Sequence, residues 1–193
     1  MDKTEKNEEN KYGFQEYVKA DPADTPPSRP GYSVTLDDHI LYTILVEQPI
    51  SIDLLYQRMA PILGNSKVTT RITTAVDMAL AHLGDKVVRK EGFLTRTGFQ
   101  NPAVRIPSGG EEQRLISHIA PEELMEAMRT VAEHSFGLTY ESLVIETAKA
   151  LGYQRRGARI QSVLERILDA LVQRKVIHII DGKVNSVEGS ING

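Results

Sequence analysis

Apolar residues recur at helical spacing in two stretches of the chain, and the two stretches match each other. A shift of 88 positions places Gly64 on Gly152 and holds without a gap through the apolar positions around them. The same shift superposes Leu55 on Leu143, Ala60 on Ala148, Arg71 on Arg159, Leu80 on Leu168 and Leu83 on Leu171. A fixed shift of this kind indicates two copies of one small structural unit.

The first copy predicts three helices followed by a β-hairpin. Thr35 and Asp38 form a capping-box pattern at the start of the first helix. Ser51 is a suitable cap for the second helix, which Pro61 should kink or stop near Ala60 because proline removes a backbone donor. The predicted elements are helices over about 36–47, 51–64 and 69–83, and strands over 87–90 and 93–96 around a turn at Glu91-Gly92.

The second copy predicts the same order of elements. Pro121 suits a first helical turn, and the positive end of a helix dipole accounts for Glu122 and Glu123 there. Leu168, like its counterpart Leu80, is predicted on the buried stripe of the third helix. The predicted elements are helices from Pro121 to about Ser135 and from Thr139 to Gly152, a third with its stripe from Ile160 to Leu171, and strands over 175–180 and 183–187 around Asp181-Gly182.

Three helices and a hairpin in about 65 residues are the winged-helix arrangement, a variant of helix-turn-helix. The predicted fold class is therefore mainly α with small β-hairpins (α+β), built from two tandem winged-helix units. The predicted organisation is a flexible tail or upstream linker over 1–32, a first unit over 33–98, a linker over 99–118, a second unit over 119–188 and a disordered end over 189–193. Two interpretations of the tail stay open: a strap laid across a folded domain, or the trailing end of a larger polypeptide.

Composition narrows the possible partners. The 193 residues carry a formal net charge of −3 with a pI of about 6.0, so the chain lacks the basic footprint of a dedicated nucleic-acid binder and any such binding needs a local patch. The absence of cysteine fits a reducing compartment. The polar N-terminus and the lack of a long apolar run predict a soluble, cytoplasmic protein without a membrane partner.

One basic cluster stands out around the third helix of the second unit. Between Tyr153 and Lys175 lie six positive residues against Glu165 and Asp169. The candidate nucleic-acid-binding residues are Arg155, Arg156, Arg159 and Arg166 in this unit and Lys67, Thr69, Thr70 and Arg71 in the first.

For the equivalent pair Arg71 and Arg159 we favour a structural role, in which they bond helix-end carbonyls or Glu side chains. Because they occupy equivalent positions in two diverged copies, a role in holding the fold together is favoured over a role in contacting nucleic acid. For Arg155 and Arg156 a phosphate contact and a solvated charge run are both open.

Catalytic patterns are nearly absent from the sequence. It contains no P-loop, G-x-G-x-x-G, H-E-x-x-H or G-x-S-x-G pattern. An apolar strand that ends in Asp181-Gly-Lys183 resembles the metal-binding heart of restriction-type nucleases, but Asp-Gly between short strands is a preferred hairpin turn and the first copy lacks the lysine. We therefore expect no enzyme activity, no cofactor and no metal site.

The segment from His134 to Ile160, continued by Leu-Val-Gln-Arg-Lys-Val176, resembles an uncharacterised domain at the C-terminal end of large bacterial superfamily-one helicase-like proteins. Those proteins carry an ATPase core and often a Vsr-like nuclease domain. The first copy shares the resemblance through Val68 to Ile72 and Gly92 to Leu94. The resemblance implies a non-catalytic accessory domain that binds DNA beside a helicase or ATPase core, in cis or in trans. The alternative is a protein-docking tandem winged-helix module that binds an ATPase partner.

Overall fold

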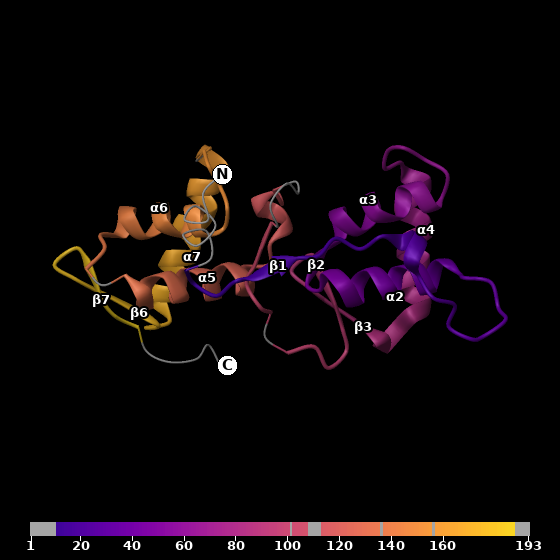
Figure 1. The fold of residues 1–193 in the computed structure, drawn as a ribbon, viewed down its shortest axis with the longest axis horizontal. Helices are drawn as coiled ribbons and strands as arrows, with labels where there is room; N and C mark the ends of the chain where they lie inside the picture. The colour runs from indigo at the N-terminus through magenta and orange to yellow at the C-terminus, as the bar shows by residue number, and fades with distance from the viewer. Residues whose placement is uncertain (1–10, 101, 108–112, 136, 156, 188–193) are drawn as a thin grey trace, which may run out of the picture. The chain divides into compact units, whose positions relative to one another are not determined.

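A computed structural model describes residues 11–100, 102–107, 113–135, 137–155 and 157–187, with 185–187 described by their backbone only. The chain combines helices with small sheets, which confirms the predicted α+β class (Figure 1). It divides into two compact units. The first unit comprises Val18–Pro102 and Ser117–Ala120, and the second comprises the described residues up to Tyr17, those of Ala103–Ile116 and those from Pro121 onward.

The first unit is a three-helix cluster with a three-stranded sheet. Its elements are the 3₁₀ turn η1 (Pro22–Asp24), α2 (Leu36–Glu47), β2 (Ile50–Ser51), α3 (Ile52–Ile62), α4 (Thr70–Leu83), the 3₁₀ turn η2 (Gly84–Lys86), β3 (Val87–Lys90) and β4 (Phe93–Arg96), with η3 (Ile116–His118) at the boundary with the second unit. The strands pair antiparallel in the order β2-β4-β3. Ile40 of α2, Leu55 of α3, Ile72 of α4 and Leu94 of β4 meet in one core, each at most 1% exposed. Each of the three helices and the central strand β4 thus contributes a buried side chain to the core of the unit.

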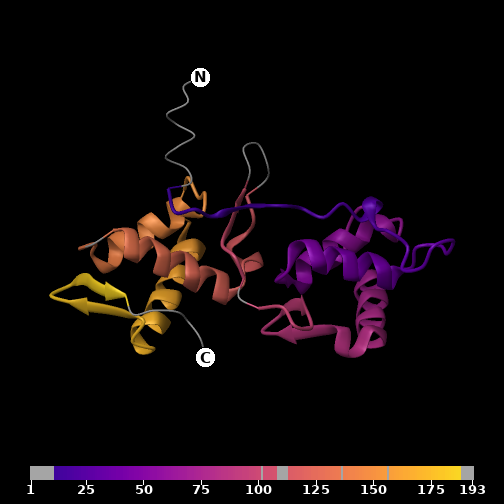
Figure 2. The same ribbon diagram turned by 60° about the horizontal axis from the view of Figure 1, so that its bottom comes forward.

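The second unit repeats the three helices and the hairpin. Its elements are β1 (Gln15–Tyr17), β5 (Arg105–Pro107), α5 (Pro121–His134), α6 (Tyr140–Ala150), α7 (Ala158–Gln173), β6 (Ile177–Ile180) and β7 (Lys183–Val187). The core contains Met128 of α5, Leu143 of α6, Leu164 of α7 and Val184 of β7, all at most 2% exposed. The paired arrows of β6 and β7 follow α7 directly in the ribbon (Figure 2).

The segment just before the second helix joins the hairpin in both units. In the first unit Ile50 and Ser51 lie opposite Leu94 and Phe93. In the second, the Val184 amide donates to the Leu138 carbonyl at 2.8 Å, and a single bridge joins Thr139 to Lys183. Each unit therefore has three helices followed by a hairpin, and the segment before the second helix is bonded to the hairpin as strand β2 in the first unit and through an isolated bridge in the second.

The register between the copies changes before the hairpin, at the end of the third helix. The turn residues Glu91 and Asp181 both have positive φ, at 50° and 52°, and each is followed by a glycine in the same region. These turns lie 90 positions apart because α7, with 16 residues, is two residues longer at its C-terminal end than α4, with 14. The shift of 88 without a gap therefore holds as far as Leu83 and Leu171. Asp181-Gly182 is a hairpin turn, as its sequence predicts.

Two details of the predicted helices need correction. The second helix of the first unit continues through Pro61 to Ile62, two residues beyond the predicted kink or stop near Ala60, and its 11 residues match α6, so Pro61 does not shorten it relative to its counterpart. Pro61 is the penultimate residue of α3, and a proline there disturbs only the last turn. Leu80 is only partly buried, whereas its counterpart Leu168 is fully buried.

Parts of the predicted tail and linker belong to folded structure. Strands β1 and β5 pair in parallel, with Gln15 opposite Arg105 and Tyr17 opposite Pro107. Val104 is 5% exposed. These contacts agree with the strap interpretation of the tail. They do not fit a 1–32 segment that is flexible throughout, or a 99–118 segment that only connects two units.

Candidate nucleic-acid interface

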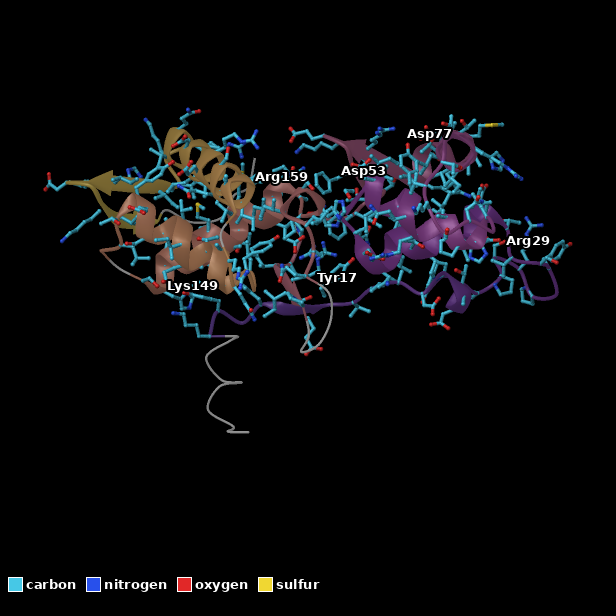
Figure 3. The ribbon with its side chains drawn as sticks, turned by 90° about the horizontal axis from the view of Figure 1, so that it is seen from above. Tyr17, Arg29, Asp53, Asp77, Lys149 and Arg159 are labelled. Atoms are coloured by element: carbon cyan, nitrogen blue, oxygen red, sulfur yellow. The ribbon has the colours of Figure 1, made fainter. Side chains whose placement is uncertain are left out.

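The third helix of each unit buries one face and exposes the other. On α7, Leu164 and Leu168 are fully buried, whereas Arg159 and Arg166 are exposed. Figure 3 labels Arg159 at the start of this helix. On α4, Arg71 takes the equivalent exposed position. The charged face of each helix is thus separate from the face that holds the unit together.

The N-terminal turns of α4 and α7 lack the side-chain cap that three other helices have. Thr35, Ser51 and Thr139 accept hydrogen bonds through their side chains from the first turns of α2, α3 and α6. Thr69 at α4 and Gly157 at α7 make no side-chain cap bond. Free N–H groups at a helix start favour an anion. Both third helices therefore have an N-terminal turn that suits a phosphate.

Cap substitutions should separate these two kinds of helix start. We expect Thr139→Ala to lower the free energy of unfolding by about 1 kcal/mol, because its hydroxyl bonds the Ser142 amide at 3.1 Å. Thr69→Ala should leave stability within about 0.5 kcal/mol of the parent, because Thr69 makes no cap bond. Urea unfolding of both variants measures the contrast. Equal losses would contradict the assignment of Thr69 as a residue without a capping role.

The structural role favoured for Arg71 and Arg159 finds no support in the structure. Both side chains are exposed, and among the described residues neither makes a hydrogen bond or an ion pair. Each is the second residue of its helix, beside the N–H groups just described. What the two arginines share across the copies is therefore an exposed position, and not a contact that stabilises the fold.

The other candidates fall into three groups. Lys67, Thr69 and Thr70 are exposed at the entry to α4. Arg155 is exposed before α7, and Arg166 bonds only the Ser162 carbonyl of its own helix, at 3.4 Å, within the described structure. Arg156 lies outside the described residues.

Acidic residues on the third helices are held by tyrosines of the second helices. The Tyr140 hydroxyl donates to Asp169 at 2.8 Å, and the Tyr56 hydroxyl donates to Asp77 at the same distance. Partial burial, followed by these carboxylate contacts, raises the pKa of each tyrosine to about 12. Both tyrosines thus stay protonated donors at neutral pH. Asp169 and Asp77 are directed toward a neighbouring helix and form no ion pair with an arginine in the described structure.

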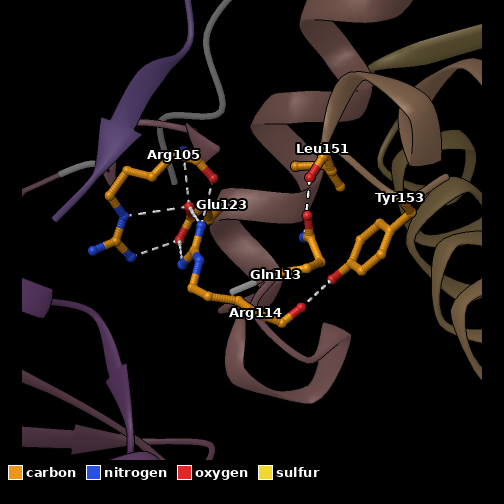
Figure 4. Close-up of polar contacts among 6 residues, drawn as sticks. All are labelled: Arg105, Gln113, Arg114, Glu123, Leu151 and Tyr153. Atoms are coloured by element: carbon orange, nitrogen blue, oxygen red, sulfur yellow. Dashed lines mark hydrogen bonds and ion pairs between the residues drawn. The ribbon is translucent and has the colours of Figure 1, made fainter. Parts of the chain in front are cut away.

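A buried ion-pair network is the main polar feature that sequence analysis missed. Glu123 is fully buried and accepts from the Arg105 guanidinium at 2.7 Å, from the Arg114 guanidinium at 2.6 Å and from the Arg105 backbone amide at 2.9 Å (Figure 4). Arg114 also donates to the Arg105 carbonyl, and the Tyr153 hydroxyl donates to the Arg114 carbonyl at 2.9 Å. The helix dipole alone does not account for Glu123. Its carboxylate fastens the predicted linker to α5.

The first unit contains a similar clamp. Glu47 is 1% exposed and accepts from Arg58 at 2.6 Å and from the Ala20 backbone amide at 3.1 Å. In each unit a buried glutamate near one end of the first helix therefore accepts from arginine and from a backbone N–H of a flanking segment. Glu47 binds one arginine and Glu123 binds two. A buried charge of this kind needs such partners.

The pH dependence of stability should reveal the Glu123 network. Burial by itself raises the pKa of Glu123, but the charges and hydrogen bonds of Arg114 and Arg105 outweigh it and hold the pKa below its ordinary value. The resulting stability is complete above the unfolded carboxyl pKa of about 4.3 and is lost as the pH falls through the folded pKa. We expect urea midpoints of the parent to fall below that pH, and those of Glu123→Gln to fall less. Parallel curves would contradict this assignment.

Within the described structure, no group of three or more His, Cys, Asp or Glu side chains is arranged to hold a metal ion. None of the helices described there is long and apolar enough to cross a membrane. Comparison with protein-family models, curated proteins and solved structures finds no match to this chain.

Proposed function

We propose that the chain consists of two tandem winged-helix units that form a non-catalytic DNA-binding accessory domain of a helicase-type nucleic-acid enzyme. The segment before the second helix supports the fold assignment, because it bonds to the hairpin in both units, as strand β2 at Ile50 in one and through Leu138 and an isolated bridge at Thr139 in the other. In helix-turn-helix folds of this type, the third helix enters the major groove and its N-terminal residues contact the bases.

One observation carries the functional proposal. The equivalent arginines Arg71 and Arg159 are exposed and unpaired within the described structure, and each begins a third helix without a side-chain cap. An anion at either site gains both a guanidinium and free backbone donors. Phosphates of a nucleic-acid backbone fit this chemistry, and Arg155 extends the positive surface at α7. Two copies of the arrangement favour an extended polyanion over a single small anion.

A salt titration tests the proposal. We expect the chain to bind duplex or forked DNA weakly, with a Kd on the order of micromolar at about 50 mM salt, and to lose affinity steeply as salt increases. Arg155→Ala combined with Arg159→Ala should flatten the slope of log affinity against log salt by up to about two units, because up to two phosphate contacts are lost. Fluorescence anisotropy gives the affinity. Unchanged urea unfolding serves as the control for folding.

The alternative is a module that docks on an ATPase partner, and one surface feature favours it. The first unit exposes Met78 of α4 at 69% and Val68 before that helix at 39%. Together with the acidic net charge, these apolar side chains suit a protein surface better than a phosphate backbone. Under this alternative, the anisotropy titration at about 50 mM salt shows no saturable DNA binding. Met78→Ala would then abolish capture of the ATPase partner.

A further inference from the structure

The N-terminal arm, residues 11–17, docks on the second unit through strand β1 (Gln15–Tyr17). The Gln15 amide donates to the Val104 carbonyl at 2.8 Å, and β1 then runs parallel to β5. Phe14 and Tyr17 are buried, at 6% and 5% exposure, whereas Gln15 and Glu16 between them are exposed. The arm is therefore held both by its backbone and by two aromatic side chains.

The surface that receives the arm is suited to aromatic residues. The Arg114 guanidinium lies 4.5 Å from the centroid of the Tyr17 ring, and that of Arg105 lies 5.7 Å away. These are cation–π distances. At the other end of the arm, the Tyr12 ring stacks on Phe14 with 5.4 Å between centroids. Because Glu123 fixes both arginines, the arm-docking surface, formed by β5, Arg105 and Arg114, is preorganised for a tyrosine.

The residues that follow the arm belong to the other unit. Val18 is 60% exposed and Lys19 is exposed, but Ala20 is buried and its amide bonds Glu47. Only two exposed residues therefore separate Tyr17, anchored in the second unit, from Ala20, anchored in the first. A short connection between two anchored elements is a setting in which identical chains exchange an element.

We propose that the arm-docking surface also binds the arm of a second copy of this chain, so that two chains exchange residues 11–17 and form a dimer. The Gln15 hydrogen bond, the β1–β5 pairing and the Tyr17–arginine contacts are all made to the second unit, so an arm from another chain can form the same contacts. Docking within one chain and between two chains then differs mainly in effective concentration. A two-stranded sheet of three-residue strands has little stability of its own, which permits the arm to leave.

Cysteine cross-linking tests this proposal on the full chain, which has no native cysteine. Glu16 lies opposite Ile106 in the β1–β5 pair. One preparation carries Glu16→Cys and a second carries Ile106→Cys, so a disulfide between the two chains forms readily only where the arm of one docks on the other. After mixing and mild oxidation, we expect this mixed dimer to exceed both homodimers and to increase with chain concentration.

Two controls make the result decisive. Lys19→Cys replaces Glu16→Cys as an exposed thiol beyond the arm and should give only the background level of mixed dimer. Adding Tyr17→Ala to Glu16→Cys should reduce the mixed dimer to that background. The proposal is overturned if Glu16→Cys and Lys19→Cys give equal yields with Ile106→Cys, whether or not the double variant Glu16→Cys/Ile106→Cys closes a disulfide within one chain. If the two yields are equal and the double variant closes its disulfide, the arm docks only within its own chain. If the yields are equal and the disulfide does not close, β1 and β5 do not pair in solution.

Discussion

Replacing Glu123 with glutamine should lower the free energy of unfolding of the second unit by about 3–5 kcal/mol. The carboxylate is fully buried and is the acceptor for both Arg105 and Arg114, so the substitution leaves two buried guanidinium groups without a counter-charge. Glutamine has nearly the same shape as glutamate. The loss thus reports the charge and not a cavity. Urea unfolding followed by circular dichroism measures it.

Glu141→Gln provides the matched control. Glu141 is an exposed residue in the first turn of α6, and the change removes the same charge from the same kind of position in a helix. We expect its effect to stay within about 0.5 kcal/mol. If Glu123→Gln cost no more than Glu141→Gln, the network would not hold Arg105 and Arg114 to α5.

The second large effect is expected at Leu168. Leu168→Ala should cost about 2–5 kcal/mol, because the side chain is fully buried between the helices of its unit and truncation leaves a cavity. Leu80→Ala, at the equivalent position of the first unit, should cost less than about 2 kcal/mol because Leu80 is only partly buried. Unfolding of the two variants side by side measures the difference. Equal costs would contradict the difference in packing between the two copies.

The repeat explains why much of the local structure was predictable from the sequence. Thr35 with Asp38, and Ser51 with its counterpart Thr139, mark three helix starts that the structure confirms. The hairpin strands of the first unit begin and end where β-propensity and Glu91-Gly92 place them. These signals are short-range, and the Ser51 and Thr139 caps and the Glu91-Gly92 and Asp181-Gly182 turns occur in both copies, so one copy supports the interpretation of the other.

Contacts distant in sequence were not predictable in the same way. Glu123 is one of a pair of acidic residues at a helix start, a pattern that the helix dipole explains well enough without burial. Its partners Arg105 and Arg114 lie in a segment whose prolines and glycines indicate a linker. Ala20 likewise gives no local sign that its amide will bind Glu47. The one hint was the apolar character of residues such as Tyr17 and Val104 within polar surroundings.

The candidate interface was only partly predictable. The basic residues, including Arg155 and Arg159, were predictable because charge clusters are visible in the sequence itself. The equivalence of Arg71 and Arg159 favours a structural role for these two candidates, but equivalence between copies does not distinguish a shared contact from a shared exposed position. Only the structure separates the two, through the exposure of these side chains and the absence of caps at the starts of α4 and α7.

A matched pair of charge reversals tests the proposed DNA-binding role most directly. Arg159→Glu alters the first turn of α7, whereas Arg29→Glu makes the same change in net charge at an exposed position in the loop before α2. Anisotropy with one duplex at about 50 mM salt compares the two variants with the parent. The proposal predicts that Arg159→Glu weakens binding by about tenfold or more and that Arg29→Glu has a much smaller effect. Equal affinities for the two variants would contradict it.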